Sequence, residues 1–474
     1  MTPRGRDLAV QSSVEPGSFR DHDSRVFLGP DGVHRVLSSD GLADWRALSA
    51  SPLWHELQEE GRVVRTEEAE PGALPDLLAG AAAGVLRHER VPFVSYPYEW
   101  PFSMLRDAAL LQLELNRRAL RADLTLKDAS PYNVQFDGTA PVFIDVGSFE
   151  RLRPGEPWAG YRQFCMLFLY PLMLQAYKDL PYHAALRGSL DGIPPHDARA
   201  MLAGERFRKG VLANVLLHAR LEARYADAEG REVKQELRRA GFKKEILDAT
   251  LAKLEKVVRG LEWKAGETAW TGYGEDNSYD VESAGRKAQF VREAAARRRS
   301  ALAWDVGCND GAYARIAAEF ADLVVALDAD HATVDALYRR LRDDERRDIL
   351  PLVMSVTDPS PDLGWRGLER AALERRGRPE LALCLAVVHH VCITGNVPVP
   401  EFLDWLRSLD AVLVLEFPDR SDPMVQRLLS GKRDGANPGY ERAAFERALE
   451  ERFTVERSAA VSETRTVYEA RPRA

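Results

Sequence analysis

The chain contains few cysteines and lacks a long uninterrupted apolar segment. Four of its 474 residues are cysteine. Because none of them forms a CxxC pair, neither a disulfide framework nor a structural zinc site is expected. The most apolar run, residues 164–174, contains Pro171 and is too short to span a bilayer. Residues 1–14 are polar and lack the apolar core of a signal peptide. We therefore expect a soluble, cytoplasmic protein.

The chain also lacks an excess of basic residues over acidic ones. The formal net charge is -8 at pH 7, and 45% of the residues are hydrophobic. A modestly acidic protein is a poor default partner for nucleic acid or for an anionic membrane. The hydrophobic share is normal for globular proteins, and the length predicts roughly two to four domains.

The composition along the chain predicts three parts. Residues 1–14 are expected to be a disordered tail, residues 15–262 an N-terminal domain that ends in a helical extension, and residues 263–474 a C-terminal domain. The boundary is placed where Gly, Trp and Thr cluster after a long stretch rich in Ala, Leu, Lys, Arg and Glu. Within the N-terminal domain, apolar residues at helical spacing predict a helix over residues 103–120.

Strand-like runs alternate with helical segments in the C-terminal domain. This alternation predicts an α/β domain with a Rossmann-like parallel sheet and helices on both of its faces. The predicted strands cover residues 301–306, 323–327, 349–356, 381–387 and 411–416.

The most informative motif joins the first two predicted strands. The first strand ends at Asp305, a turn with Gly307 and Gly311 then opens a helix, and the second strand ends in Asp328. Glycines let backbone approach a ligand, a helix N-terminus offers free N–H groups, and an acid after the second strand can bind ribose hydroxyls. The acid before the turn suits a ligand with an ammonium group better than a pyrophosphate. A dinucleotide oxidoreductase is therefore the least favoured interpretation.

This unit resembles the class I S-adenosylmethionine-dependent methyltransferases over about residues 270–470. The resemblance implies S-adenosyl-L-methionine as cofactor, Asp328 as the ligand of its ribose, and Asp358, after the third strand, as a contact of its adenine. It also implies a loop around the methionine part of the cofactor, formed by Asp305, Gly307, Asn309 and Gly311.

The segment before this core offers two further candidates. Many methyltransferases use the corresponding segment to cover the cofactor, which implies that Asn277 and Tyr279 touch the cofactor or the acceptor. A helix-capping loop is an equally good interpretation of the same residues.

Three residues at the ends of the fourth and fifth strands are candidates for catalysis: His389, His390 and Glu416. Methyl transfer mainly requires an aligned and desolvated acceptor, and an imidazole with a pKa near neutrality can take the acceptor's proton. Adjacent residues that leave a strand point in different directions, so we expect one histidine in the site and the other in a structural role. Two alternatives are that both histidines bond backbone around the cofactor and, less favoured, that the three residues bind a metal.

A second motif lies in the N-terminal domain. Two short predicted strands, 133–136 and 141–144, form a hairpin. The hairpin places Asp128 and Asn133 before it and Asp145 directly after it. Oxygen side chains that converge in this way suit a Mg²⁺-phosphate site.

The hairpin motif resembles the catalytic and metal-binding loops of protein kinases and of aminoglycoside phosphotransferases. The resemblance implies an α+β kinase-like domain, in which Asp128 is the base and Asn133 and Asp145 hold Mg²⁺ when ATP binds. The predicted helix at 103–120 and a strand-like segment at 92–98 fit the helix and the hinge of the second lobe.

The N-terminal sequence departs from that pattern in three ways. Leu126 stands where these families have histidine, and neither a Gly-rich phosphate loop nor a Val-Ala-x-Lys strand is found. We therefore favour a methyltransferase for a small molecule, a glycan or a peptide, whose kinase-like domain positions the acceptor. The alternatives are a bifunctional phosphotransferase–methyltransferase and a non-catalytic cofactor-binding scaffold. The two-part arrangement is loosely similar to bacterial proteins related to host-specificity nodulation factors.

Overall fold

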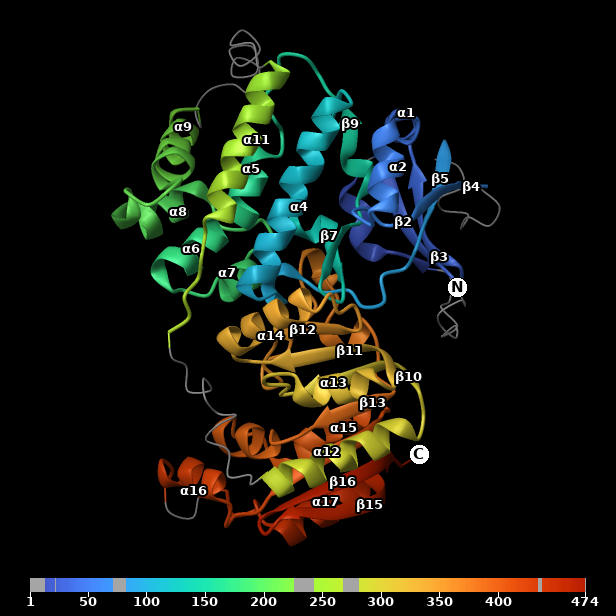
Figure 1. Ribbon diagram of the computed structural model, residues 1–474, viewed down its shortest axis with the longest axis vertical. Coiled ribbons are helices and arrows are strands. Elements are labelled where there is room, and N and C mark those ends of the chain that lie inside the picture. Colours follow the sequence, from blue (N-terminus) through green and yellow to red (C-terminus); the bar gives the residue numbers. More distant parts are fainter. Residues whose placement is uncertain are drawn as a thin grey trace.

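The computed structural model describes residues 13–21, 23–70, 82–225, 243–266, 281–433 and 437–473. They form an N-terminal and a C-terminal domain, which lie one above the other along the long axis of the molecule (Figure 1). Within these ranges no helix has the length and apolar character that crossing a membrane requires.

An antiparallel five-stranded sheet opens the N-terminal domain. Pro30 and Asp31, both typical turn residues, connect its second strand to its third. Because the first strand pairs with the second, the expected disordered tail is wrong for its last two residues. The strand order is β1-β2-β3-β5-β4, with β1 (Ser13–Val14), β2 (Ser24–Gly29), β3 (Gly32–Leu37), β4 (Thr66–Ala69) and β5 (Gly84–His88).

Two short helices, α1 (Ser39–Ser49) and α2 (Pro52–Glu59), follow β3. Ser38 caps α1, since its hydroxyl accepts a hydrogen bond from the Gly41 N–H. The two helices pack against each other through the rings of Trp45 and Trp54, which meet edge to face with 5.0 Å between their centroids.

The central helix of the N-terminal domain is α4 (Phe102–Arg121). Its apolar side chains recur at helical spacing and are buried, which confirms the predicted helix over residues 103–120. The further helices of this domain are α5 (Tyr161–Phe164), α6 (Tyr170–Lys178), α7 (His183–Gly188), α8 (Pro195–Leu202), α9 (His218–Tyr225) and α11 (Lys244–Arg259).

Two small hairpin-like sheets accompany α4. Strand β6 (Leu124–Leu126) pairs with β9 (Phe149–Arg151), and β7 (Val134–Asp137) pairs with β8 (Ala140–Phe143). The second pair confirms the predicted hairpin. Its turn reaches the C-terminal domain, where the Thr139 hydroxyl donates to the backbone carbonyl of Arg346 at 2.8 Å.

The predicted strand at 92–98 is wrong. This segment is irregular and ends in the short helix η2 (Pro97–Glu99). Prolines at 92 and 97 remove backbone donors. In addition, the N–H and C=O of Ser95 bond to the side-chain amide of Gln135, and therefore not to a neighbouring strand. The segment is a linker between the first sheet and α4.

The C-terminal domain contains a seven-stranded sheet in the order β12-β11-β10-β13-β14-β16-β15. The five strands predicted from the sequence are present and parallel, whereas the antiparallel hairpin at the C-terminus was not predicted. The strands are β10 (Ser300–Val306), β11 (Ala321–Asp328), β12 (Ile349–Val353), β13 (Leu381–Cys384), β14 (Val412–Pro418), β15 (Phe453–Ser462) and β16 (Arg465–Pro472).

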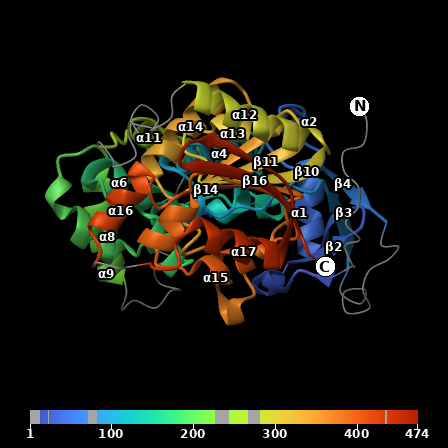
Figure 2. The same ribbon diagram turned by 90° about the horizontal axis from the view of Figure 1, so that it is seen from below.

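Helices cover both faces of this sheet, as predicted (Figure 2). One face carries α12 (Val281–Ala296), α13 (Ala312–Ala318) and α14 (His331–Asp343). The other carries α15 (Val399–Ser408) and α17 (Arg442–Arg452), while α16 (Pro423–Ser430) follows β14 at one end.

The N-terminal domain extends slightly past the predicted boundary at 262. Trp263, expected in the C-terminal domain, packs on Phe102 of α4 with 6.3 Å between ring centroids. Its indole N–H donates to Asp179 Oδ1 at 2.6 Å. Trp263, the first residue of the cluster that suggested a new domain, therefore belongs to the N-terminal domain.

The two domains share a hydrophobic core. Edge strand β12 and helix α14 lie next to the N-terminal domain (Figure 1). The buried ring of Tyr338 on α14 meets Phe136 edge to face at 6.2 Å, and its hydroxyl donates to Asp107 Oδ2 at 2.9 Å. One cluster of buried apolar residues runs through both domains, so the surfaces where they meet are packed against each other and not exposed to solvent.

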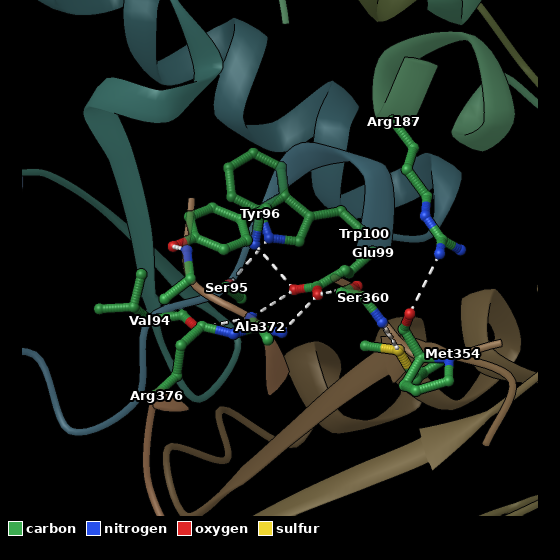
Figure 3. Close-up of polar contacts among 12 residues, drawn as sticks. Val94, Ser95, Tyr96, Glu99, Trp100, Arg187, Met354, Ser360, Ala372 and Arg376 are labelled. Carbon is green, nitrogen blue, oxygen red and sulfur yellow. Dashed lines mark hydrogen bonds and ion pairs between the residues drawn. The ribbon is translucent and has the colours of Figure 1, made fainter. Parts of the chain in front are cut away.

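A buried ion pair joins the linker to the C-terminal domain (Figure 3). Arg376 donates to both carboxylate oxygens of Glu99, at 2.6 and 2.7 Å, and the two side chains are 2% and 1% exposed. The same carboxylate accepts from the Ser360 hydroxyl at 2.5 Å and from the Tyr96 N–H at 2.9 Å. Arg376 also donates to Val94 O. This dense bonding offsets the desolvation of both charges.

We expect Arg376→Met to destabilise the protein strongly. The substitution leaves the Glu99 carboxylate buried without its cation, which typically costs about 3–5 kcal/mol. The free energy of unfolding from urea denaturation, followed by far-UV circular dichroism, measures this loss.

Arg347→Ala is the matched control, because its ion pair with Asp137 at 3.1 Å also crosses the domain contact. The Arg347 side chain is 60% exposed, so its loss should cost at most about 1 kcal/mol. Equal effects of the two substitutions would contradict the central role of the buried pair.

Candidate cofactor and active site

The turn after β10 is bonded onto the end of β11. The N–H groups of Gly307 and Cys308 both donate to Leu327 O, at 2.8 and 3.0 Å. The next N–H, of Asn309, donates to Asp328 Oδ2 at 2.9 Å. Loop and strand end therefore form one unit, and the sequence-predicted Asp305, Gly307, Asn309, Gly311 and Asp328 lie together at the carboxyl edge of the sheet.

Both predicted glycines have left-handed backbone, with φ of 73° at Gly307 and 79° at Gly311. A Cβ atom at Gly307 would lie 2.3 Å from Val387 Cγ2, and one at Gly311 would lie 2.6 Å from Leu337 Cδ1. Protein atoms, rather than a ligand, thus occupy the space that we expected the glycines to leave open. The glycines shape the turn and let the chain enter α13.

Asp305 is buried with an unsatisfied oxygen. It is 1% exposed, and its Oδ2 atom has no hydrogen-bond partner among the residues that the structure describes. Burial, together with the negative charge of Asp328, raises the pKa of Asp305 to about 7. A buried carboxylate oxygen without a partner suits a positively charged ligand group.

Asp328 holds the turn in place with both of its oxygens. Oδ2 accepts from Asn309, and Oδ1 accepts from the Asp330 N–H at 2.9 Å. Burial raises its pKa. Because each carboxylate oxygen has a second lone pair, the group can still accept hydrogen bonds from two hydroxyls of a ligand.

His389 and His390 do not end strand β13 as predicted. The strand stops at Cys384, and the histidines begin a helical turn, η10 (His390–Thr394). Their ring centroids are 4.1 Å apart. His389 is fully buried, and neither of its ring nitrogens has a hydrogen-bond partner within the described ranges. His390 is partly exposed.

Both histidines are held in the neutral form. Burial lowers the pKa of His389 well below its usual value, and the neighbouring His390 adds to this effect. Burial and the positive charge of Arg465 lower the pKa of His390 to about 4. At neutral pH both imidazoles are therefore unprotonated but weak bases, because their pKa values lie below the near-neutral pKa that the predicted proton acceptor requires.

Glu416 lies in a buried cluster of four charges. Its oxygens lie 2.5 Å from Lys287 Nζ and 3.4 Å from Arg465 Nη1, and the glutamate side chain is completely buried. Arg465 also donates to Asp422 Oδ2 at 2.7 Å. Two cations thus balance two carboxylates. This arrangement does not support the predicted catalytic role of Glu416, since the carboxylate is enclosed by its ion pairs.

Asp358 follows β12, as predicted, but its carboxylate binds another protein group. Arg187 of α7 donates to both carboxylate oxygens at 2.9 Å. The Asp358 side chain is nevertheless 74% exposed, so the predicted contact with adenine would share the carboxylate with this ion pair.

Two predictions remain: the cofactor contacts of Asn277 and Tyr279, and the alternative of a metal site. Asn277 and Tyr279 lie outside the described residues. Within the described ranges no group of three or more His, Cys, Asp or Glu side chains could hold a metal ion, so His389, His390 and Glu416 do not form one.

Asp128 and Asp145, two of the three N-terminal candidates, lie close enough to interact. Asp128 is largely buried, and burial together with the charge of Asp145 raises its pKa to about 6. Asp145 lies 2.9 Å from Arg35 Nη1 on β3. Asn133 ends the short helix η3 (Pro131–Asn133), and its carbonyl accepts the Ile144 N–H at 2.8 Å. The Asp145 carboxylate, which was predicted to hold Mg²⁺, is therefore paired with the guanidinium of Arg35.

Sequence reasoning missed three cations: Arg35, Lys287 and Arg465. Each pairs with a carboxylate far away in the chain, so no local spacing reveals it. Arg35 lies on β3 (Gly32–Leu37) between apolar residues, but no motif in that strand singles it out.

The strand order of the C-terminal sheet, with its last strand inserted antiparallel beside the fifth parallel strand, is that of the class I methyltransferase fold. Among solved structures, the N-methyltransferase NodS from Bradyrhizobium japonicum WM9 is 10% identical with a TM-score of 0.31, over 41% of this chain and 98% of NodS. The magnesium protoporphyrin IX methyltransferase from Synechocystis PCC 6803 with bound S-adenosylhomocysteine is 18% identical with a TM-score of 0.30, over 42% of this chain and 90% of that enzyme.

The sequence also has a relative that spans both domains. Nodulation protein NoeA of Rhizobium meliloti (strain 1021) is 34% identical over 445 residues, which make up 93% of this chain and 92% of NoeA. The chain therefore belongs to the NoeA family. No family model matches the sequence.

We expect Asp305→Asn to stabilise the ligand-free protein at pH 8 more than at pH 5. The pKa of Asp305 is raised from its ordinary value of 3.8 to about 7. Between these values the folded protein keeps a proton that the unfolded chain has lost, so this group lowers stability as the pH rises through its folded pKa. Asparagine removes that penalty.

Urea denaturation at the two pH values measures the difference. Asp322→Asn, on the exposed side of the neighbouring strand β11, is the control and should show no such pH-dependent gain. A constant difference between wild type and Asp305→Asn across pH 5 to 8 would show that Asp305 is already ionised at low pH.

Proposed function

We propose that this protein transfers a methyl group from S-adenosyl-L-methionine to a small molecule, a glycan or a peptide. The observation that carries this proposal is the buried Asp305 oxygen that lacks a hydrogen-bond partner among the described residues. It lies near Asp328, whose carboxylate is bonded to the turn after β10. One acid suits an ammonium group and the other suits ribose hydroxyls, and they lie at the carboxyl edge of a parallel sheet, where ligands of such sheets bind.

The residues of the site fit this cofactor. Asp305 in its ionised form pairs with the amino group of the methionine part. Asp328 accepts from the ribose hydroxyls with its remaining lone pairs. The sulfonium supplies an activated methyl group when the cofactor is bound. The protein then has to align an acceptor atom with that methyl and keep water away.

His390 is the residue that we assign to the acceptor. It is the histidine of the pair that is partly exposed, and it is neutral because its pKa is lowered to about 4. With the cofactor bound, the neutral imidazole would accept a hydrogen bond from the acceptor and so align the acceptor atom with the methyl group. His389, buried behind it at 4.1 Å, positions the ring.

The N-terminal domain is proposed to have a kinase-like fold without phosphotransfer. Its five-stranded antiparallel sheet, followed by a linker and a helical part, supports the kinase-like interpretation. The ion pair of Arg35 with Asp145 argues against Mg²⁺ binding. The backbone groups of the linker are also not available to a nucleotide. The N–H and C=O of Ser95 bond to the Gln135 side chain, and the Tyr96 N–H bonds to the Glu99 side chain. We therefore favour a role in positioning over a second catalytic activity.

Isothermal titration of the full-length protein with S-adenosylmethionine tests the proposal. Wild type should bind, and Asp328→Ala should weaken binding at least tenfold, because the ribose loses a charged acceptor worth about 1.5–3 kcal/mol. Asp322→Ala lies on the same strand at its amino end and should bind like wild type.

A parallel titration with ATP and Mg²⁺ separates the proposed function from a bifunctional phosphotransferase. We expect no heat of ATP binding. Folded wild-type protein that binds ATP but no S-adenosylmethionine would refute the methyltransferase assignment and favour the kinase-like half as the active one.

A further inference from the structure

The segment after β12 lies next to the acid that is assigned to the ribose. Val353, the last residue of β12, pairs with Asp328, and the Met354 N–H donates to the Asp328 carbonyl at 2.7 Å. A nucleoside whose ribose is held by Asp328 therefore extends along the sheet edge toward residues 354–360.

The N-terminal domain grips this segment from two elements. Arg187 on α7 donates to both oxygens of Asp358 at 2.9 Å and to Pro359 O at 3.0 Å. From the linker, Glu99 accepts the Ser360 hydroxyl at 2.5 Å. Figure 3 shows Arg187 and Glu99 approaching the segment from separate parts of the N-terminal domain. Two charged groups thus hold consecutive residues after β12.

Helix α7 is itself held against the linker and against the start of α14. The Tyr182 hydroxyl and the His183 ring both bond to the Trp100 carbonyl, at 2.6 and 2.9 Å. The His183 ring packs edge to face on His331, with 4.2 Å between centroids. His331 begins α14, shortly after Asp328. Helix α7 therefore contacts the chain that follows β11 as well as the chain that follows β12.

From these contacts we infer that the N-terminal domain is part of the cofactor site, with Arg187 as a positioning residue for the adenine-binding edge. The inference rests on the proposed function. Arg187 fixes residues 354–360 in the shape that receives the adenosine end, so cofactor affinity depends on a residue of the other domain.

Another ion pair of the domain contact serves as a control. Arg347 and Asp137 are 3.1 Å apart, and Arg347 lies two residues before β12, which begins at Ile349. This pair joins the same two domains at the amino end of the strand, whereas Arg187 acts at the carboxyl end. A contact that merely joins the domains would matter equally at both ends.

The test is calorimetric titration of full-length wild type, Arg187→Ala, Arg187→Lys and Arg347→Ala with S-adenosylhomocysteine. Coupling between sites is typically worth about fivefold or more in affinity. Arg187→Ala should therefore weaken binding by about fivefold or more, Arg187→Lys should restore part of the loss, and Arg347→Ala should match wild type. Melting temperatures of all four proteins show that each is folded.

Each outcome has a distinct meaning. If wild type and Arg187→Ala bind equally well, the positioning role of Arg187 is refuted while the proposed function stands. If Arg347→Ala loses as much affinity as Arg187→Ala, the effect is one of general domain attachment, and the inference is also wrong. If folded wild type does not bind the ligand, the proposed function fails and this inference fails with it.

Discussion

The arrangement of the two domains depends on one buried ion pair, Glu99 with Arg376. Both side chains are almost completely removed from water, and a pair of this kind is tolerated only when every charge is hydrogen-bonded. Here the carboxylate has four donors, from Arg376, Ser360 and Tyr96, and the guanidinium also reaches a linker carbonyl. Because a bidentate pair allows only a small range of distances and orientations, it fixes the linker against the segment before β13.

Once the linker is fixed, the position of the proposed ligand-binding edge of the sheet follows. Strand β12 is an edge strand, and the N-terminal domain lies along it. The short helix η2 contacts the strand itself, the β7–β8 turn bonds to Arg346 before the strand, and Arg187 of α7 bonds to Asp358 after it. The covered edge includes the chain that follows β12, next to Asp328. The carboxyl edge of the sheet is therefore bounded by its own turn after β10 on one side and by the other domain beyond β12. Sheet and N-terminal domain act as one unit around the site.

The sequence predicted the local parts of this structure. The five parallel strands and the unit from Asp305 to Asp328 depend on contiguous apolar runs and a turn, which a sequence displays directly. The partners of Asp145, Asp358 and Glu416 could not be predicted, since each cation comes from a distant element. The histidine pair was placed at a strand end because the apolar residues after Cys384 continue the strand pattern, although the chain there turns into a helix.

The most direct test of the account is hydrogen–deuterium exchange of the full-length protein with and without saturating S-adenosylhomocysteine. Binding at the carboxyl edge predicts slower exchange at residues 305–312, 328–331 and 354–360, and slower exchange in α7 if the N-terminal domain completes the site. Unchanged exchange in these segments, with the protein folded and the ligand in excess, would contradict the claim that this edge of the sheet binds the cofactor.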